Sequence, residues 1–64
     1  MRKALGEKLR GTREATRMTQ KEVAEVAGVH VNYYARIERG EEIPTYDKLQ
    51  DIKKALKIKS LDLL

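Results

Sequence analysis

The sequence predicts a small all-α domain of five helices. Apolar residues recur at helical spacing through most of the 64 residues, and no segment alternates apolar and polar residues as a strand does. Helix-capping threonines and helix-ending glycines separate these periodic segments. No linker, repeat or low-complexity stretch divides the chain, so we expect residues 1–64 to form one domain.

The first helix is expected to run from near the amino terminus to about residue 16. Leu5, Leu9 and Thr12 fall on one of its faces, with charged residues elsewhere. Gly6 and Gly11 lie inside it, and each costs about 1 kcal/mol of helix stability relative to alanine. This helix therefore needs packing partners to form.

The start of the second helix is marked by Thr19 and Glu22. This spacing is a capping box, in which each side chain accepts a hydrogen bond from the backbone N–H of the other residue. Met18 and Val23 have the spacing of a hydrophobic staple around the same helix start. Gly28 is expected to end the helix, because glycine adopts the left-handed conformation without a Cβ penalty.

A third helix is expected to begin two residues after Gly28, because the chain then runs without a breaker as far as Gly40. After a loop, Thr45 provides the N-cap of a fourth helix. The apolar positions of that helix repeat at helical intervals: Leu49, Ile52 and Leu56. Ser60 then caps a short final helical turn, Leu61–Leu64.

The composition excludes several classes of function. The chain has no cysteine and one histidine, so a disulfide, a thiolate zinc site or a nucleophile–base pair is not expected. No apolar run approaches 18 residues and no secretion signal is visible, so we expect no membrane partner. A chain this short leaves no room for a large enzyme pocket or a ligand-binding domain. We therefore expect no enzyme activity, no cofactor and no small-molecule ligand.

The net charge of +4 is unevenly distributed along the chain. Residues 1–21 carry a net +5, residues 22–47 a net −4 and residues 48–64 a net +3. A small basic protein often binds a polyanion, although the same charge also serves as an ordinary solvated surface. The acidic middle segment argues against strong affinity for phosphates.

Residues 20–37 have the layout of a helix-turn-helix, with a short helix, a turn at Gly28 and a second helix. This motif requires a small residue where its two helices cross, and Ala24 meets that requirement. It also requires apolar residues between the helices, which the sequence supplies as Val23, Val29 and Ile37.

With these positions the sequence resembles the λ-repressor/Cro-like family of transcription regulators, also called the XRE family. The resemblance runs from about Leu9 to Leu64. The matching positions are Arg13, Thr19–Ala24, Gly28–Val29, Arg36–Gly40, Pro44–Thr45 and Lys54–Leu56. It implies a compact five-helix λ-repressor-like DNA-binding domain with the helix-turn-helix as its second and third helices. It also implies a sequence-specific regulator of double-stranded DNA, cytoplasmic and associated with the nucleoid, without deciding between repressor and activator.

The resemblance places the third helix in the major groove of the DNA. The residues expected to read bases there are His30, Val31, Asn32 and Arg36. Asparagine pairs with adenine and arginine with guanine through two hydrogen bonds each, and valine covers a thymine methyl group. The residues expected to contact phosphates are Gln20, Lys21, Arg17, Tyr33 and Arg39. His30 is alternatively a helix cap and Tyr33 a surface aromatic residue, while Tyr34 is expected in the core.

The resemblance also implies a buried or half-buried salt bridge between Arg13 and Glu38, which fixes the angle of the third helix. Two positions depart from the family pattern, because Arg17 and Lys57 stand where the family favours glycine after the first and fourth helices. Glu41 and Glu42 are a further departure, since they place negative charge in a loop that approaches DNA in relatives.

The apolar residues at the carboxyl end exceed what one small core can cover, which predicts a homodimer. Its interface is expected to contain Tyr46, Ile58, Leu61, Leu63 and Leu64. Such a dimer places two reading helices about 34 Å apart, one turn of B-DNA, and predicts a palindromic operator. The alternative is a protein-interaction module of the same fold, antitoxin-like or a bridging coactivator, whose acidic middle segment meets a basic protein surface.

Overall fold

The computed structural model describes residues 2–57, and this range contains four helices. They are α1 (Arg2–Ala15), α2 (Gln20–Ala27), α3 (Val31–Glu38) and α4 (Tyr46–Ala55). Within the described residues there is no strand, so the all-α prediction is confirmed. The predicted fifth helix, Leu61–Leu64, and its cap Ser60 lie outside the described residues.

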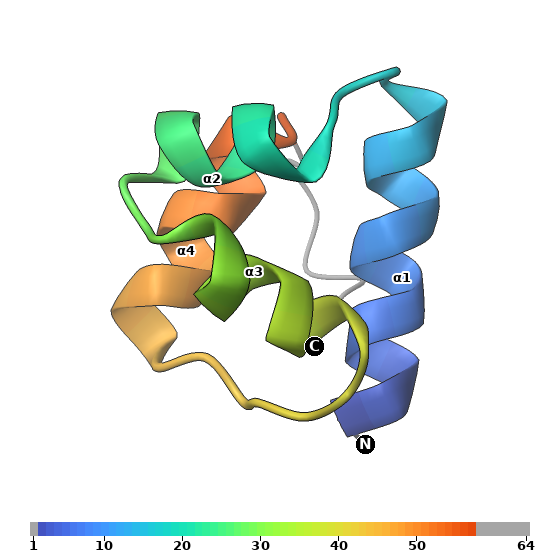
Figure 1. The fold of residues 1–64 in the computed structure, drawn as a ribbon, viewed down its shortest axis with the longest axis vertical. Helices are drawn as coiled ribbons and strands as arrows, with labels where there is room; N and C mark the ends of the chain where they lie inside the picture. The colour runs from blue at the N-terminus through green and yellow to red at the C-terminus, as the bar shows by residue number, and fades with distance from the viewer. Residues whose placement is uncertain (1, 58–64) are drawn as a thin grey trace.

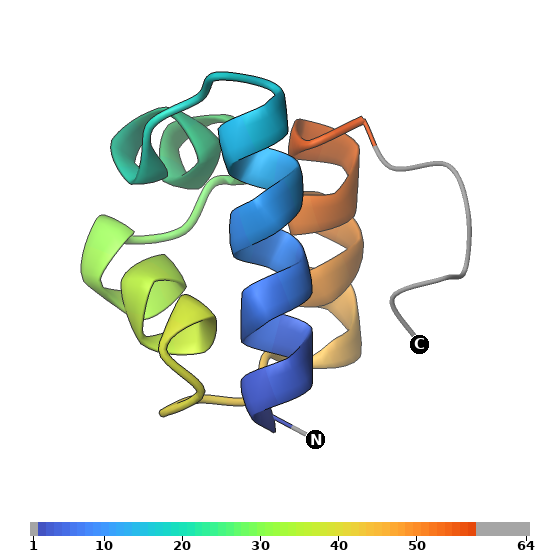
Figure 2. The same cartoon turned by 90° about the vertical axis from the view of Figure 1, so that its right-hand side faces the viewer.

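The four helices surround one small core. α1 packs against α3, and α2 packs against both α3 and α4 (Figure 1). When the molecule is turned by 90°, α2 and α3 lie together on one side of α1 and α4 lies on the other (Figure 2). In the range 2–57 no helix combines the length and apolar character needed to cross a bilayer.

Most of the core residues are those that the helical periodicity predicts. The buried cluster consists of Leu9, Val23, Ala24, Ala27, Tyr34, Ile37, Ile52, Ala55 and Leu56. Ala24 is only 1% exposed, as expected for a residue where α2 packs against its neighbours. Tyr34 is fully buried, as predicted, whereas Val29 is only partly buried against the cluster.

The predicted capping box at the start of α2 is present. Thr19 Oγ1 accepts a hydrogen bond from the Glu22 backbone N–H at 3.0 Å, and the Thr19 backbone N–H donates to Glu22 Oε1 at 2.8 Å. Gly28 ends the helix in the left-handed conformation, with φ +76°. The turn before α3 therefore depends on local residues as predicted.

Gly6 allows α1 to approach the carboxyl end of α3 closely. A Cβ atom at this position would lie 2.5 Å from the Ile37 carbonyl oxygen and closer still to that of Glu38. These are backbone atoms, which cannot move aside without shifting α3. The glycine that weakens α1 on its own is thus what allows α1 to hold α3 in place.

Arg17 and Lys57 both adopt the left-handed conformation, each with φ +60°. Arg17 follows α1 in a turn in which the Met18 backbone N–H donates to the Arg13 carbonyl oxygen and the Arg17 N–H to that of Glu14. These are the two bonds of the helix-ending motif that normally uses glycine. The structure explains why these two positions favour glycine, and the side chains there carry a conformational cost.

Candidate nucleic-acid interface

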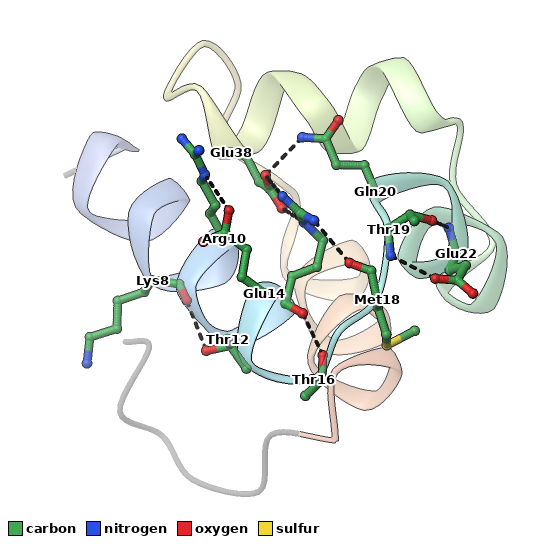
Figure 3. A network of polar contacts seen from close by, with 11 residues as sticks. Lys8, Arg10, Thr12, Glu14, Thr16, Met18, Thr19, Gln20, Glu22 and Glu38 are labelled. Carbon is green, nitrogen blue, oxygen red and sulfur yellow. Dashed lines mark hydrogen bonds and ion pairs between the residues drawn. The ribbon is translucent and has the colours of Figure 1, made fainter.

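A buried ion pair attaches the carboxyl end of α3 to α1. Arg13 Nε donates to Glu38 Oε2 at 2.7 Å and Arg13 Nη2 to Glu38 Oε1 at 3.1 Å. The Glu38 side chain is only 3% exposed. Arg13 Nη1 also donates to the Met18 carbonyl oxygen at 3.0 Å, so the same guanidinium holds the turn before α2 (Figure 3). The predicted salt bridge is confirmed, and it links three segments.

The Glu38 carboxylate is held in its charged form. Burial alone would raise the pKa of Glu38, but the hydrogen bonds from Arg13, with smaller contributions from Tyr34 and Gln20, outweigh it and lower the pKa. The Tyr34 hydroxyl lies beside this carboxylate without a hydrogen bond of standard geometry, and burial raises its pKa. The cluster is therefore ionised Glu38 with neutral Tyr34 at neutral pH.

Gln20 has a contact that the sequence did not predict. Its Nε2 donates to Glu38 Oε1 at 2.9 Å, so the amide of the first α2 residue belongs to the same network (Figure 3). This bond leaves the second Nε2 hydrogen, the side-chain oxygen and the backbone N–H as the remaining polar groups of Gln20. Its contact with a phosphate stays a prediction.

An open pocket of about 220 Å³ lies where α1, the start of α2 and the end of α3 meet. Its lining residues are Arg10, Arg13, Gln20, Glu38 and Arg39. The three arginines of the lining each pair with a different carboxylate: Arg10 with Glu14, Arg13 with Glu38 and Arg39 with Glu41. Because a helix amino terminus also favours anions, this pocket is suited to a phosphate group.

Arg10 is a pocket residue that the sequence analysis missed. Its Nε donates to Glu14 Oε2 at 3.2 Å, an exposed pair one helical turn apart. The available signal was its spacing from Arg13, because residues three apart share a helix face.

The exposed face of α3 presents two of the four predicted base-reading residues. Asn32 and Arg36 are both exposed and lie one helical turn apart, so they are neighbours on this face. Val31 and Tyr33 are partly buried and pack against the core. Their methyl groups and ring are thus partly covered by the protein itself.

His30 is the N-cap of α3. Its Nδ1 accepts a hydrogen bond from the Asn32 backbone N–H at 3.0 Å. The capping alternative is therefore present in the structure, and it leaves Nε2 as the remaining polar atom of the ring. The exposed ring can still donate one hydrogen bond outward, so its reading role stays a prediction.

The loop after α3 pairs its carboxylates with arginines of the same region. Glu41 accepts from Arg39 Nε at 3.0 Å and from Arg39 Nη2 at 3.1 Å. Glu42 Oε1 lies 3.8 Å from Arg36 Nε. With Glu38 bound to Arg13, three carboxylates of the acidic middle segment are neutralised internally. Arg36 and Arg39 are already counted in the net −4 of residues 22–47, so only the Arg13–Glu38 pair brings in positive charge from outside the segment, and the acidic segment still argues against strong affinity for phosphates.

The other predicted residues lie at the edges of this region or outside the described range. Arg17 and Lys21 are exposed, in the turn before α2 and in its first helical turn. Tyr46 of the predicted dimer interface is 71% exposed at the start of α4. The remaining interface residues, Ile58, Leu61, Leu63 and Leu64, lie outside the described residues.

Comparisons with known proteins agree with this geometry. Residues 9–64 match a family model described as helix-turn-helix. The restriction-modification controller protein C.AhdI from Aeromonas hydrophila is similar, with a TM-score of 0.93 and 25% identity over 98% of this chain and 96% of that one. The clp gene regulator ClgR from C. glutamicum has a TM-score of 0.89 and 32% identity over 97% of this chain and 80% of that one. No curated protein matches the chain significantly in sequence.

Proposed function

Since this chain belongs to the XRE-type helix-turn-helix family, we propose that it binds double-stranded DNA sequence-specifically and regulates transcription, with α3 in the major groove. One observation carries the proposal. α3 exposes Asn32 and Arg36 on its outer face while its opposite side is anchored by Ile37 in the core and by Glu38 on Arg13. Base reading requires a firmly anchored helix whose exposed face carries side chains that can each make two hydrogen bonds to one base. Asn32 and Arg36 are such side chains.

The pocket at the start of α2 supplies the second part of the proposal. A backbone phosphate is held there by Arg10, Arg39 and the amino terminus of α2, with Lys21 and Arg17 contacting neighbouring phosphates. Such contacts set the register of α3 on the duplex without reading bases. Because Arg13 and Gln20 are bound to Glu38, this part of the pocket is already in place before DNA binds.

We further propose that the protein acts as a homodimer on a palindromic operator. The support is the exposed apolar surface at Tyr46 and Ile43, which are 71% and 59% exposed. In a dimer with its two-fold axis near the start of α4, each copy covers this surface of the other. The two copies of α3 then face the same side of the duplex.

Binding of an operator and of unrelated duplex, measured over a range of salt concentrations, tests the proposal. Asn32→Ala or Arg36→Ala is expected to reduce the preference for the operator by about 1–3 kcal/mol and to leave nonspecific binding nearly intact. Arg39→Ala is expected to weaken binding to both duplexes equally. It is also expected to reduce the slope of log affinity against log salt concentration by about one. Lys21→Ala removes a second proposed phosphate contact, on α2, and is expected to behave like Arg39→Ala.

Two results contradict the proposal. One is the same change in operator preference and in nonspecific binding for both groups of variants, because loss of a base reader and loss of a phosphate contact must have different effects. The other is affinity without salt dependence, because each neutralised phosphate releases counterions. Tight binding of a basic protein surface with no duplex binding points instead to the protein-interaction module.

A further inference from the structure

The Arg39 guanidinium is already occupied by an anion of this chain. Glu41 accepts two parallel hydrogen bonds from Arg39 Nε and Nη2, at 3.0 and 3.1 Å. This two-bond arrangement is the one that guanidinium groups also make with a phosphate. Arg39 lines the anion-suited pocket at the start of α2, so the pair lies at the rim of the proposed phosphate site.

Glu41 is fixed in this position by the end of α3. Its backbone N–H donates to the Arg36 carbonyl oxygen at 2.9 Å, and the Gly40 N–H donates to that of Ile37 at 3.1 Å, with Gly40 at φ +78°. These bonds form a helix-ending motif that fixes the position of the Glu41 backbone relative to the end of α3. The carboxylate is therefore placed against Arg39 by the backbone as well as by its charge.

We propose that Glu41 is a built-in competitor of DNA, whose carboxylate takes the place of a backbone phosphate on Arg39 and must be displaced when a duplex binds. This inference rests on the proposed function. Both side chains are about half exposed, 55% for Arg39 and 54% for Glu41, so the pair is a solvated one that a phosphate can replace. Its effect is to weaken binding to every duplex alike, because a phosphate contact carries no sequence information.

Glu42 provides a graded comparison within the same loop. Its Oε1 is 3.8 Å from Arg36 Nε, an ion pair without a hydrogen bond among the described residues. Glu42 is therefore a weaker competitor for its arginine than Glu41. Since Arg36 is the proposed guanine reader, any effect of Glu42 falls on the preference for the operator rather than on all DNA.

The test compares Glu41→Gln with Glu25→Gln in duplex-binding titrations at about 0.15 M salt. The control removes one negative charge from an exposed position on α2 that has no ion pair among the described residues. Glu41→Gln is expected to bind operator and unrelated duplex about two- to five-fold more tightly than the control does. The slope of its log affinity against log salt concentration is expected to be steeper by up to about one, the change that one more phosphate contact gives.

A second arm uses Arg39→Gln, made in the wild type and in Glu41→Gln. Competition predicts a larger loss of affinity in the Glu41→Gln background, where Arg39 is free to contact DNA. Equal losses in both backgrounds, or equal affinities of Glu41→Gln and Glu25→Gln, overturn the inference while leaving the proposed function standing. If the wild type and every variant fail to bind any duplex, the proposed function itself fails and this inference fails with it.

Discussion

Glu38 is the residue on which the placement of α3 depends most. Its carboxylate accepts three hydrogen bonds from Arg13 and Gln20, so one side chain joins α3 to α1 and to the start of α2. A buried ion pair adds little net stability over an apolar pair, but the loss of one partner leaves a buried charge unpaired. We therefore propose that Glu38 specifies the angle of α3.

Glu38→Ala is expected to destabilise the protein by about 3–5 kcal/mol, because it leaves the Arg13 guanidinium without its partner. Thermal unfolding followed by circular dichroism measures this change. Glu41→Ala is the matched control, since it removes the partner of an exposed arginine and is expected to leave the melting temperature close to that of the wild type. Similar melting temperatures for wild type and Glu38→Ala would contradict the structural role of this pair.

The same residue predicts a sensitivity to acid. The pKa of Glu38 is lowered from its ordinary value of 4.5 in the folded protein, so the folded state favours the charged carboxylate. This contribution is fully present above the ordinary value and is lost as the pH falls through the lowered pKa. The free energy of unfolding is thus expected to decrease from about pH 5 downward. In Glu38→Gln this decrease should be smaller, and an unchanged pH profile in that variant would contradict the expectation.

At the scale of elements, α1 is a weak helix that is stabilised by what it contacts. Gly6 and Gly11 have the same intrinsic cost in the sequence, but their surroundings differ. Gly6 faces the last carbonyl groups of α3, whereas a Cβ at Gly11 has nothing within 4 Å. The two glycines therefore predict opposite effects of the same substitution.

Gly6→Ala is expected to destabilise the protein by about 2 kcal/mol or more, because the new methyl group meets backbone atoms of α3. Gly11→Ala is expected to stabilise it by about 1 kcal/mol, through the higher helix propensity of alanine. Chemical denaturation of the two variants measures both changes. Stabilisation by Gly6→Ala would show that α1 does not approach α3 this closely.

Substitutions in the turns that end α1 and α4 are expected to separate stability from DNA binding. Arg17→Gly and Lys57→Gly are each expected to stabilise the protein by about 1 kcal/mol, because both residues have φ +60°. Only Arg17→Gly is expected to weaken duplex binding, since Arg17 is a proposed phosphate contact. Denaturation and salt-dependent binding assays measure the two effects, and unchanged binding by Arg17→Gly would remove that residue from the interface.

The elements were largely predictable from the sequence because their ends have local signals. The Thr19 box, Gly28 and the Thr45 cap lie within a few residues of what they determine. The contacts of Gln20, Arg10 and the loop carboxylates were not predictable in this way. They depend on which side chains from separate helices come to face each other, and helical spacing does not specify that.

At the scale of the whole molecule, we propose that charge and assembly determine how tightly DNA is bound. Arg10 and Arg13 of α1 and Arg39 after α3 line one pocket, and each is paired with a carboxylate of the same chain. Because the pocket arginines and Arg36 are already paired with carboxylates, we expect modest affinity for a single half-site. Two copies acting together are expected to supply both the affinity and the palindromic specificity.

The predicted dimer is tested by sedimentation equilibrium at high micromolar concentration. The wild type is expected to sediment as a dimer, and Tyr46→Lys to shift it toward monomer by placing a charge in the interface. Val26→Lys is the matched control, because Val26 is a similarly exposed apolar residue, at 67%, on α2. A wild type that sediments only as monomer would contradict the dimer.

Selection of bound sequences from a random duplex pool tests the central claim most directly, because it asks whether the exposed face of α3 reads bases. The wild type is expected to enrich a two-fold-symmetric consensus, and the Asn32→Ala, Arg36→Ala double variant to enrich none while still binding DNA at low salt. The same consensus from both proteins, or none from the wild type, would contradict the assignment of α3 as the reading helix.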